Sequence, residues 1–326
     1  MKTIELLKQS LVNEGVWFAC LRVLKAAARA ADRFIRSIPY FYTSLIKDAV
    51  TIPVNDYRLK IFLKDRGIAR DLFVHHQREH LAKDLIHSHG VLRKGDIVLD
   101  IGANIGYYAI MESRLVGETG CVLAVEPSPK NFDLLNENIR LNSVQNIKTY
   151  NLAMGETNGK AEMYISNRSN WSRLVDKDLN DTINETVAVD ISTVDEFIKD
   201  RPLPTFVRMD LEGYEINILR GMTKWMTNDN LTIFVEFHPH FMSHAECMEC
   251  FDILKAAGFK LTKCLLNPCL EQNFAVRFAY EKLEELDNYT GKVWEMSIDD
   301  ARDWVLTHDI KRMPHFLFTK NLHTST

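Results

Sequence analysis

Carboxylates and a histidine stand at the ends of two apolar runs in the second half of the chain. Asp210 and Glu212 follow the first run, and Glu236 and His238 come two residues apart at the end of the second. Residues two apart on a strand point to the same face, so Glu236 and His238 should lie side by side. A carboxylate or a histidine that faces a cleft can remove a proton from a hydroxyl group. The alternatives are a turn or cap carboxylate at Asp210 and a hydrogen-bonded structural histidine at His238.

A glycine-rich turn precedes these groups, in the segment DIGANIG from Asp100 to Gly106. Where a buried strand turns into a helix, such glycines let a ligand approach the backbone beside the helix N-terminus. Glu126 ends the next predicted strand, where a carboxylate can accept hydrogen bonds from both hydroxyls of a ribose. We therefore expect a nucleoside ligand. The spacing of Gly102 and Gly106 differs from the Gly-x-Gly-x-x-Gly of dinucleotide sites, which disfavours a nicotinamide-dependent oxidoreductase.

The elements that must position these residues alternate between strands and helices from about residue 90 onward. This alternation is typical of a mostly parallel sheet with helices on both faces. The polar stretch 166–184 is predicted to be a loop. The predicted strands cover residues 97–101, 121–125, 147–153, 186–189, 206–209, 231–237, 259–265 and 315–319, and the predicted helices cover residues 105–116, 129–141, 194–199, 212–221 and 244–257.

Two segments precede the predicted core domain, which covers residues 90–326 with 266–313 as an insertion before the last strand. Residues 1–50 form a predicted helical appendage in which Pro39 should break the helix. Residues 51–89 form a predicted lead-in hairpin and helix. Eight Lys and Arg against four Asp and Glu in residues 1–50 allow contact with an anionic membrane. The favoured interpretation is that the appendage packs its apolar stripe onto the core domain.

Composition narrows the class of protein. Apolar residues make up 46% and charged residues 26% of the 326 residues, values that are typical of a folded globular protein. A net charge of -4 gives no general attraction for nucleic acid. The start of the sequence shows neither a secretory signal nor an apolar stretch that could span a bilayer. We therefore expect a cytoplasmic protein with reduced thiols, whose contact with a membrane, if any, is peripheral.

The motifs together resemble a known family. They are the turn from Asp100 to Gly106, VEPSP at 125–129, Asn136 and Asn142, MDLEGYE at 209–215 and VEFH at 235–238. Over about residues 75–262, with 315–320 as a last strand, the chain resembles FkbM-type S-adenosylmethionine-dependent methyltransferases. The resemblance implies a class I methyltransferase-like (Rossmann-like) α/β fold with a mostly parallel seven-stranded sheet. Arg208 departs from the family pattern, which more often has lysine at this position.

The resemblance also implies a site for S-adenosyl-L-methionine. The methionine end of this cofactor would lie over the glycine turn, its ribose on the carboxylate of the next strand, and its adenine against the end of the third strand. The predicted cofactor-binding residues are Asp100, Gly102, Asn104, Gly106, Glu126, Ala153 and Met154.

Methyl transfer is an in-line displacement, so the protein must align the acceptor and remove a proton if the acceptor is a hydroxyl. The predicted function is O-methylation of a hydroxyl on a sugar, glycan, glycolipid or polyketide-like metabolite. The alternative is a non-catalytic nucleoside-binding module on the same fold.

The predicted catalytic residues are Asp210, His238 and Glu212, and the predicted substrate-binding residues are Glu215, Glu236, Trp171 and Arg173. Trp171 and Arg173 lie in a segment that could equally be a solvated surface loop.

We expect no metal site from the sequence. One alternative is Mg²⁺ held by Asp210 with Glu236 or His238, because hard oxygen ligands suit this ion. The other alternative is zinc bound by four cysteines. The favoured interpretation of these cysteines is that they are small buried thiols in a helix and a strand, without a metal. These cysteines are Cys247, Cys250, Cys264 and Cys269.

Overall fold

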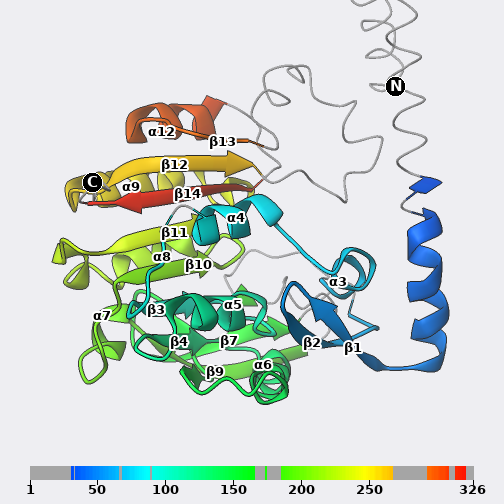
Figure 1. The fold of residues 1–326 in the computed structure, drawn as a ribbon. Coiled ribbons are helices and arrows are strands. Elements are labelled where there is room, and N and C mark those ends of the chain that lie inside the picture. The colour runs from blue at the N-terminus through cyan, green and yellow to red at the C-terminus, as the bar shows by residue number, and fades with distance from the viewer. Residues whose placement is uncertain are drawn as a thin grey trace, which may run out of the picture.

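The fold is seen in a computed structural model (Figure 1), which describes residues 31–32, 34–65, 68–88, 90–165, 173–174, 185–266, 292–307 and 313–320. Trp171 and Cys269, which the sequence analysis singled out, lie outside the described residues.

A large sheet forms the centre of the molecule, with the strand order β13-β12-β14-β11-β10-β3-β4-β5 (Figure 1). The strands β5, β4, β3, β10 and β11 are parallel, and β14 is antiparallel to both β11 and β12. The bounds are β3 Ile97–Ile101, β4 Cys121–Val125, β5 Ile147–Tyr150, β10 Phe206–Asp210, β11 Thr232–Glu236, β12 Lys260–Leu266, β13 Val293–Trp294 and β14 Pro314–Thr319.

This order confirms the predicted class I methyltransferase-like α/β fold. Seven of the strands follow the chain order 3-2-1-4-5-7-6, in which the antiparallel last strand lies between the fifth and the sixth. The predicted strand count of seven was one too low, because the short strand β13 from the predicted insertion adds to the edge at β12.

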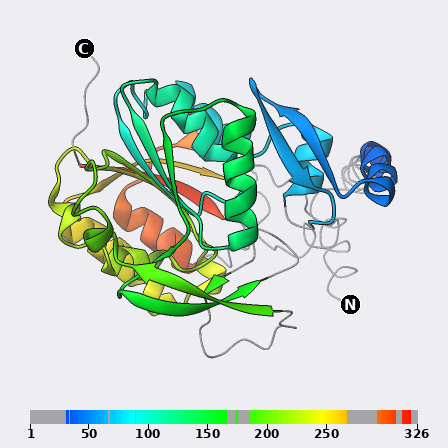
Figure 2. The same cartoon turned by 90° about the horizontal axis from the view of Figure 1, so that it is seen from below.

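Helices cover both faces of this sheet (Figure 2). Alternate strand residues point to opposite faces, so Val98 and Leu99 of the same strand belong to different hydrophobic clusters. One face packs against α4 (His80–Ser88), α5 (Tyr107–Val116) and α6 (Pro129–Leu141). The other packs against α7 (Val194–Phe197), α8 (Glu215–Arg220), α9 (His244–Ala256) and α12 (Ile298–Thr307). Short 3₁₀ helices cover Trp225–Thr227 and Pro239–Phe241.

A second, four-stranded sheet has the order β6-β9-β7-β8. Its strands are β6 Ala153–Met154, β7 Gly159–Ile165, β8 Arg173–Leu174 and β9 Glu185–Ser192. The predicted strand 147–153 is therefore two strands in two sheets. The Asn151 side chain donates hydrogen bonds to the carbonyls of Glu126 and Pro127, which fixes the chain where it leaves the large sheet. The strands β7 and β8 were missed, β8 within the stretch 166–184 that was predicted to be a loop, and the strand predicted at 186–189 lies in this second sheet.

The lead-in segment is a hairpin of β1 (Ala49–Val54) and β2 (Tyr57–Phe62), followed by α3 (Ala69–His75) and α4. The side-chain amides of Asn138 on α6 and of Asn142, which caps the end of α6, each form hydrogen bonds with the β2 backbone, at Lys60 and Arg58 respectively. The hairpin therefore shares a hydrophobic cluster with one face of the large sheet. The hairpin confirms the prediction, whereas α3 was not predicted.

Residues 34–46 form a helix that continues through Pro39, so the predicted break there was wrong. Proline removes a backbone donor from a helix without necessarily ending it. Most apolar side chains of this helix are exposed, with Leu45 at 82% and Ile46 at 81%. Tyr40 is buried and donates a hydrogen bond to the carbonyl of Leu63. For residues 34–46, the prediction that the apolar stripe packs onto the core domain was therefore wrong.

Candidate active site

The chain reverses its direction of travel across the large sheet between β3 and β10. It moves outward from β3 to β4 and β5, and later returns to β10 on the other side of β3. Ligands of open α/β sheets bind at such a switch point, beyond the carboxyl ends of the strands. Gly102 follows β3 and Asp210 ends β10, and a Cβ atom on Gly102 would lie 2.3 Å from the Asp210 carbonyl oxygen. The two strand ends are thus in direct contact.

Gly102→Ala tests this close approach. Gly102 has φ +86 and Gly258 has φ +85, but a Cβ atom on Gly258 would have no atom within 4 Å. Both alanine variants carry the strain of a positive φ, and only Gly102→Ala adds the clash with Asp210. We expect Gly102→Ala to lower the free energy of unfolding by about 1–3 kcal/mol more than Gly258→Ala, measured by urea denaturation. Equal losses in the two variants would contradict the contact.

Glu126 lies directly beyond β4 and is buried. Its Oε2 accepts a hydrogen bond from the backbone N–H of Asn104 at 2.8 Å, and its Oε1 accepts one from Ser128 N–H at 2.9 Å. Burial raises the pKa of Glu126 to about 7, and these N–H donors act against the rise. Asn131 Nδ2 makes a third, longer contact with Oε1 at 3.5 Å, so of the about four acceptor positions of an ionised carboxylate one on Oε2 stays open. The carboxylate is therefore held rigidly by the glycine turn.

Arg208 joins the ends of the two central strands. Its Nη1 lies 3.2 Å from Asp100 Oδ1 and its Nη2 lies 2.8 Å from Asp210 Oδ2. Its guanidinium carbon stands 3.8 Å from the centre of the Tyr108 ring. Arginine can bridge two carboxylates and stack on a ring at the same time, which a lysine ammonium group cannot do as well. This accounts for arginine at a position where the family more often has lysine.

The other predicted cofactor residues lie at the start of α5 and in β6. Gly106 has φ +92 and is the N-cap of α5, where a glycine adopts this conformation without strain. Ala153 and Met154 lie in β6 of the second sheet, with both side chains buried in hydrophobic clusters. Their predicted contact with adenine would therefore involve the backbone, and it stays a prediction.

The turn after β10 directs Glu212 toward His238. Glu212 has φ +50 and Gly213 has φ +97, and a Cβ atom on Gly213 would lie 2.4 Å from Phe241 Cβ. This left-handed turn places Glu212 Oε2 3.6 Å from His238 Nε2. The other ring nitrogen, His238 Nδ1, lies 2.6 Å from Glu215 Oε1. Glu215, His238 and Glu212 thus form a line of three groups, called here the Glu–His–Glu relay.

The relay gives its members different protonation states. Burial alone would lower the pKa of His238, but Glu215, Glu236 and Glu212 together raise it to about 10. Burial raises the pKa of Glu212 to about 7, and the positive charge of His238 limits this rise. The raised pKa favours the imidazolium form of His238 at neutral pH, in which the ring has no lone pair free to accept a proton. Of the predicted catalytic residues, Glu212, with a pKa raised to about 7, is then the better candidate for a base.

Two of the predicted substrate-binding residues meet at His238. Glu215 is fully buried, with Oε1 2.6 Å from His238 Nδ1, which fits a positioning role. Glu236 ends β11 beside Asp210, its register partner on β10, and its Oε1 lies 4.0 Å from His238 Nε2. Arg173 lies in β8 of the second sheet, and only its backbone is described.

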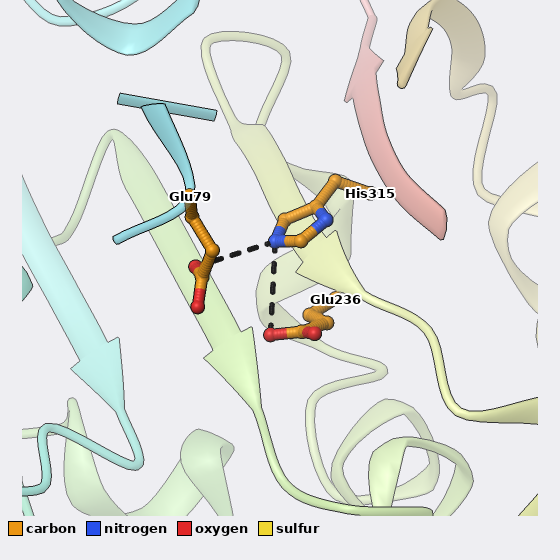
Figure 3. A group of neighbouring side chains, drawn as sticks. All are labelled: Glu79, Glu236 and His315. Atoms are coloured by element: carbon orange, nitrogen blue, oxygen red, sulfur yellow. Dashed lines mark ion pairs between the residues drawn. The ribbon is translucent and has the colours of Figure 1, made fainter. Parts of the chain in front are cut away.

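A second polar group was missed by the sequence analysis. Glu79 precedes α4, and His315 is the register partner of Glu236 on the antiparallel strand β14. The His315 ring lies between the two carboxylates (Figure 3). The alternation of β14 could have shown that His315 is buried, but only the paired register shows which carboxylate it faces.

The cysteines agree with the favoured interpretation. Cys247 and Cys250 lie in α9 and Cys264 in β12, all three buried in one hydrophobic cluster. Among the residues with described positions, the groups that could hold a metal ion contain histidine and carboxylates only.

The strand order and the switch point define a fold of the class I methyltransferase type. Residues 100–261 match the family model of the methyltransferase FkbM domain. Residues 100–261 therefore resemble the methyltransferase FkbM domain, as the motifs predicted.

Among the known proteins similar to this chain are two relatives and one solved structure. Methyltransferase 1 of Beauveria bassiana is 24% identical over 157 residues, which are 42% of this chain and 63% of the relative. Hexuronic acid methyltransferase AglP of Haloferax volcanii is 30% identical over 146 residues, 44% of this chain and 56% of the relative. Both matches thus span less than two thirds of the relative. The methyltransferase FkbM structure from Methylobacillus flagellatus is 20% identical with a TM-score of 0.39, covering 69% of this chain and 54% of that one.

Proposed function

We propose that this methyltransferase transfers a methyl group from S-adenosyl-L-methionine to a hydroxyl group of a sugar, glycan, glycolipid or polyketide-like metabolite. The observation that carries the proposal is the Glu–His–Glu relay, which ends in a carboxylate with a pKa of about 7 beside the switch point. A base of this kind suits a hydroxyl acceptor, which must lose a proton, better than an acceptor that needs no deprotonation.

The cofactor site is the glycine turn with Glu126. The open position on Glu126 Oε2 suits one ribose hydroxyl, and the other hydroxyl can replace the long 3.5 Å contact from Asn131, while Asn104 and Ser128 hold the carboxylate in place. Asp100 Oδ2 is buried and has no hydrogen-bond partner in the described part of the chain, which suits an ammonium group at the methionine end. When bound, S-adenosylmethionine supplies a methyl group that is activated by a sulfonium.

The chain's own residues align the acceptor and move its proton. Glu212 accepts the proton of the hydroxyl at a carboxylate oxygen, while the hydroxyl oxygen's electron pair takes the methyl group; the bond from that carbon to sulfur would break, and its electron pair would leave with the thioether. His238 remains protonated and stabilises the ionised form of Glu212 before the transfer. Glu215 holds the imidazolium through Nδ1. Asp210, held by Arg208, keeps the end of β10 fixed against the glycine turn and is 27% exposed, so it can contact the acceptor.

A sugar-type acceptor has further support in the relatives, because AglP is named for methylation of a hexuronic acid. The test is incubation with methyl-labelled S-adenosylmethionine and a panel of uronic acids, neutral glycans and polyketides. Mass spectrometry and NMR of the product should show an O-methyl group. Methylation at carbon or nitrogen would contradict the proposal. Binding of S-adenosylmethionine without transfer to any acceptor would favour the non-catalytic module, and binding of NAD in its place would favour the oxidoreductase.

The pH dependence of turnover reports on the relay. Because Glu212 acts as a base in its ionised form, kcat should rise with pH through an apparent pKa of about 7. In His238→Asn, the amide can still donate to Glu215, but the positive charge that lowers the pKa of Glu212 is lost. The rising limb should therefore move to higher pH, measured at saturating cofactor. An unshifted limb would contradict the relay.

The described helices bear on whether the protein contacts a membrane. None of their helices is both long and apolar enough to cross a bilayer. Peripheral membrane contact remains a proposal, which the exposed apolar side chains of helix 34–46 support; they are Phe34, Ile35, Ile38, Phe41, Tyr42, Leu45 and Ile46.

A further inference from the structure

Three side chains from distant parts of the chain converge beside the relay (Figure 3). Glu79 comes from the start of α4, Glu236 from the end of β11 and His315 from the start of β14. His315 Nε2 lies 3.6 Å from Glu79 Oε2 and 3.6 Å from Glu236 Oε2. One ligand atom from each of the three residues lies within 4.8 Å of the other two.

His315 has unmet hydrogen-bonding capacity. Its side chain is 2% exposed, and neither ring nitrogen has a hydrogen-bond partner among the residues that the structure describes. Burying a polar group without a partner is costly, so such groups usually mark a bound water, an ion or a functional role. Nε2 points between the two carboxylates (Figure 3), which places the unmet capacity at the centre of the group.

The spacing fits a metal ion better than direct hydrogen bonds. Hydrogen bonds from a ring nitrogen to a carboxylate oxygen are about 2.7–3.2 Å long, shorter than the two 3.6 Å separations. Donor atoms at about 2.0–2.2 Å from one metal ion lie about 3.0–3.6 Å apart. The three ligand atoms therefore need only small side-chain movements to coordinate one ion.

The surrounding charges also favour a cation. The carboxylates of Asp210, Glu79 and Glu212 act electrostatically on Glu236, and His238 opposes them. Two arginines add positive charge: Arg78 Nη2 lies 3.3 Å from Glu79 Oε1, and Arg208 Nη2 lies 2.8 Å from Asp210 Oδ2. The carboxylates outnumber these cationic groups, which leaves the group able to accept a positive ion.

The contacts behind the ligands resemble the outer shell of a metal site. Tyr108 donates a hydrogen bond to Glu79 Oε2 at 2.7 Å, and Arg78 contacts the other oxygen of the same carboxylate. Outer-shell partners of this kind orient ligating carboxylates. Two carboxylates and one imidazole are a donor set for first-row divalent metals such as Mn²⁺, Fe²⁺ and Zn²⁺.

We propose that Glu79, Glu236 and His315 bind a divalent first-row transition metal ion. Three ligands leave open positions for water or for the acceptor hydroxyl. The other Glu236 oxygen, Oε1, lies 4.0 Å from His238 Nε2, so the ion is adjacent to the Glu–His–Glu relay. A metal-bound hydroxyl loses its proton more readily, which would aid transfer to Glu212. This role rests on the proposed methyl transfer, whereas metal binding itself does not.

The test is titration of the EDTA-treated, dialysed full chain with MnCl₂, without cofactor or acceptor, followed by calorimetry and by the loss of the free Mn²⁺ EPR signal. We expect one saturable site, and at least about tenfold weaker binding in Glu79→Gln and His315→Gln. Glu295→Gln removes an exposed carboxylate that pairs with Lys263 and should bind as the wild type does. Asp210→Asn should also retain binding, because Asp210 belongs to the other possible group, with Glu236 and His238.

The wild-type protein provides a second test that does not depend on how the variants fold. Anomalous diffraction from crystals soaked in MnCl₂ should show one peak between Glu79, Glu236 and His315. A peak at Asp210 and His238, or no saturable binding up to about 1 mM Mn²⁺, overturns the proposal. Folded Glu79→Gln and His315→Gln variants that bind as tightly as the wild type overturn it as well. None of these results bears on cofactor binding at Glu126, so the two proposals fail separately.

Discussion

Glu212→Gln should lower kcat about 100- to 10,000-fold, because it removes the group that accepts the hydroxyl proton. Glutamine has nearly the shape of glutamate and can keep the left-handed turn, but its amide is not a base. The affinity for the cofactor should change little, since the Glu212 side chain is directed toward His238 and not toward Glu126. The measurement is release of S-adenosylhomocysteine at saturating cofactor and acceptor, together with the dissociation constant of the cofactor.

Glu249→Gln is the matched control for this change. Glu249 lies on α9 and pairs with Arg220 outside the relay, at 2.7 Å between Oε2 and Nη2. Its loss should leave kcat unchanged. If Glu212→Gln retained the kcat of the wild type, Glu212 would not be the base, and Asp210 would be the next carboxylate to test.

Glu126→Gln should weaken binding of S-adenosylmethionine about 10- to 100-fold. Hydrogen bonds to a charged carboxylate contribute about 1.5–3 kcal/mol each, more than those to a neutral amide. Glutamine also offers only one acceptor oxygen, so its NH₂ group would face the backbone N–H of Asn104 or Ser128 in place of an acceptor. Calorimetry on the variant measures the effect directly.

Glu137→Gln serves as the control for Glu126→Gln. Glu137 lies on α6 and pairs with Lys60 at the surface, at 2.7 Å between Oε2 and Nζ. Its replacement should leave cofactor affinity unchanged. Comparison of thermal unfolding will show whether Glu126→Gln also loosens the glycine turn. An unchanged affinity in a folded Glu126→Gln variant would contradict the ribose assignment.

Local patterns were enough to predict the central strands and their turns. The apolar runs at β3, β4, β10 and β11 read directly as buried strands, and all four were confirmed within a few residues. The positions of Gly102 and Glu126 followed, because residues at the carboxyl ends of neighbouring parallel strands meet at one edge of the sheet. The sequence also placed Glu236 and His238 at the end of β11.

What the sequence did not reveal depends on contacts between distant residues. His315 faces Glu236 only because β14 inserts antiparallel beside β11 in one particular register. The raised pKa of His238 depends on Glu215, which lies on α8 and contacts the ring nitrogen Nδ1. The burial that raises the pKa of Glu212 likewise comes from packing of the whole domain. Spacing along the chain contains none of this information.

The crystal structure of the protein with S-adenosylhomocysteine tests the central claim most directly, because it shows where the nucleoside and the sulfur lie. We predict that the ribose hydroxyls lie within hydrogen-bonding distance of the Glu126 carboxylate, with the methionine end over Gly102 and the sulfur facing Glu212. A ligand bound elsewhere, or a crevice at the ends of β3 and β10 that stays closed to S-adenosylhomocysteine at saturating concentration, would contradict the account.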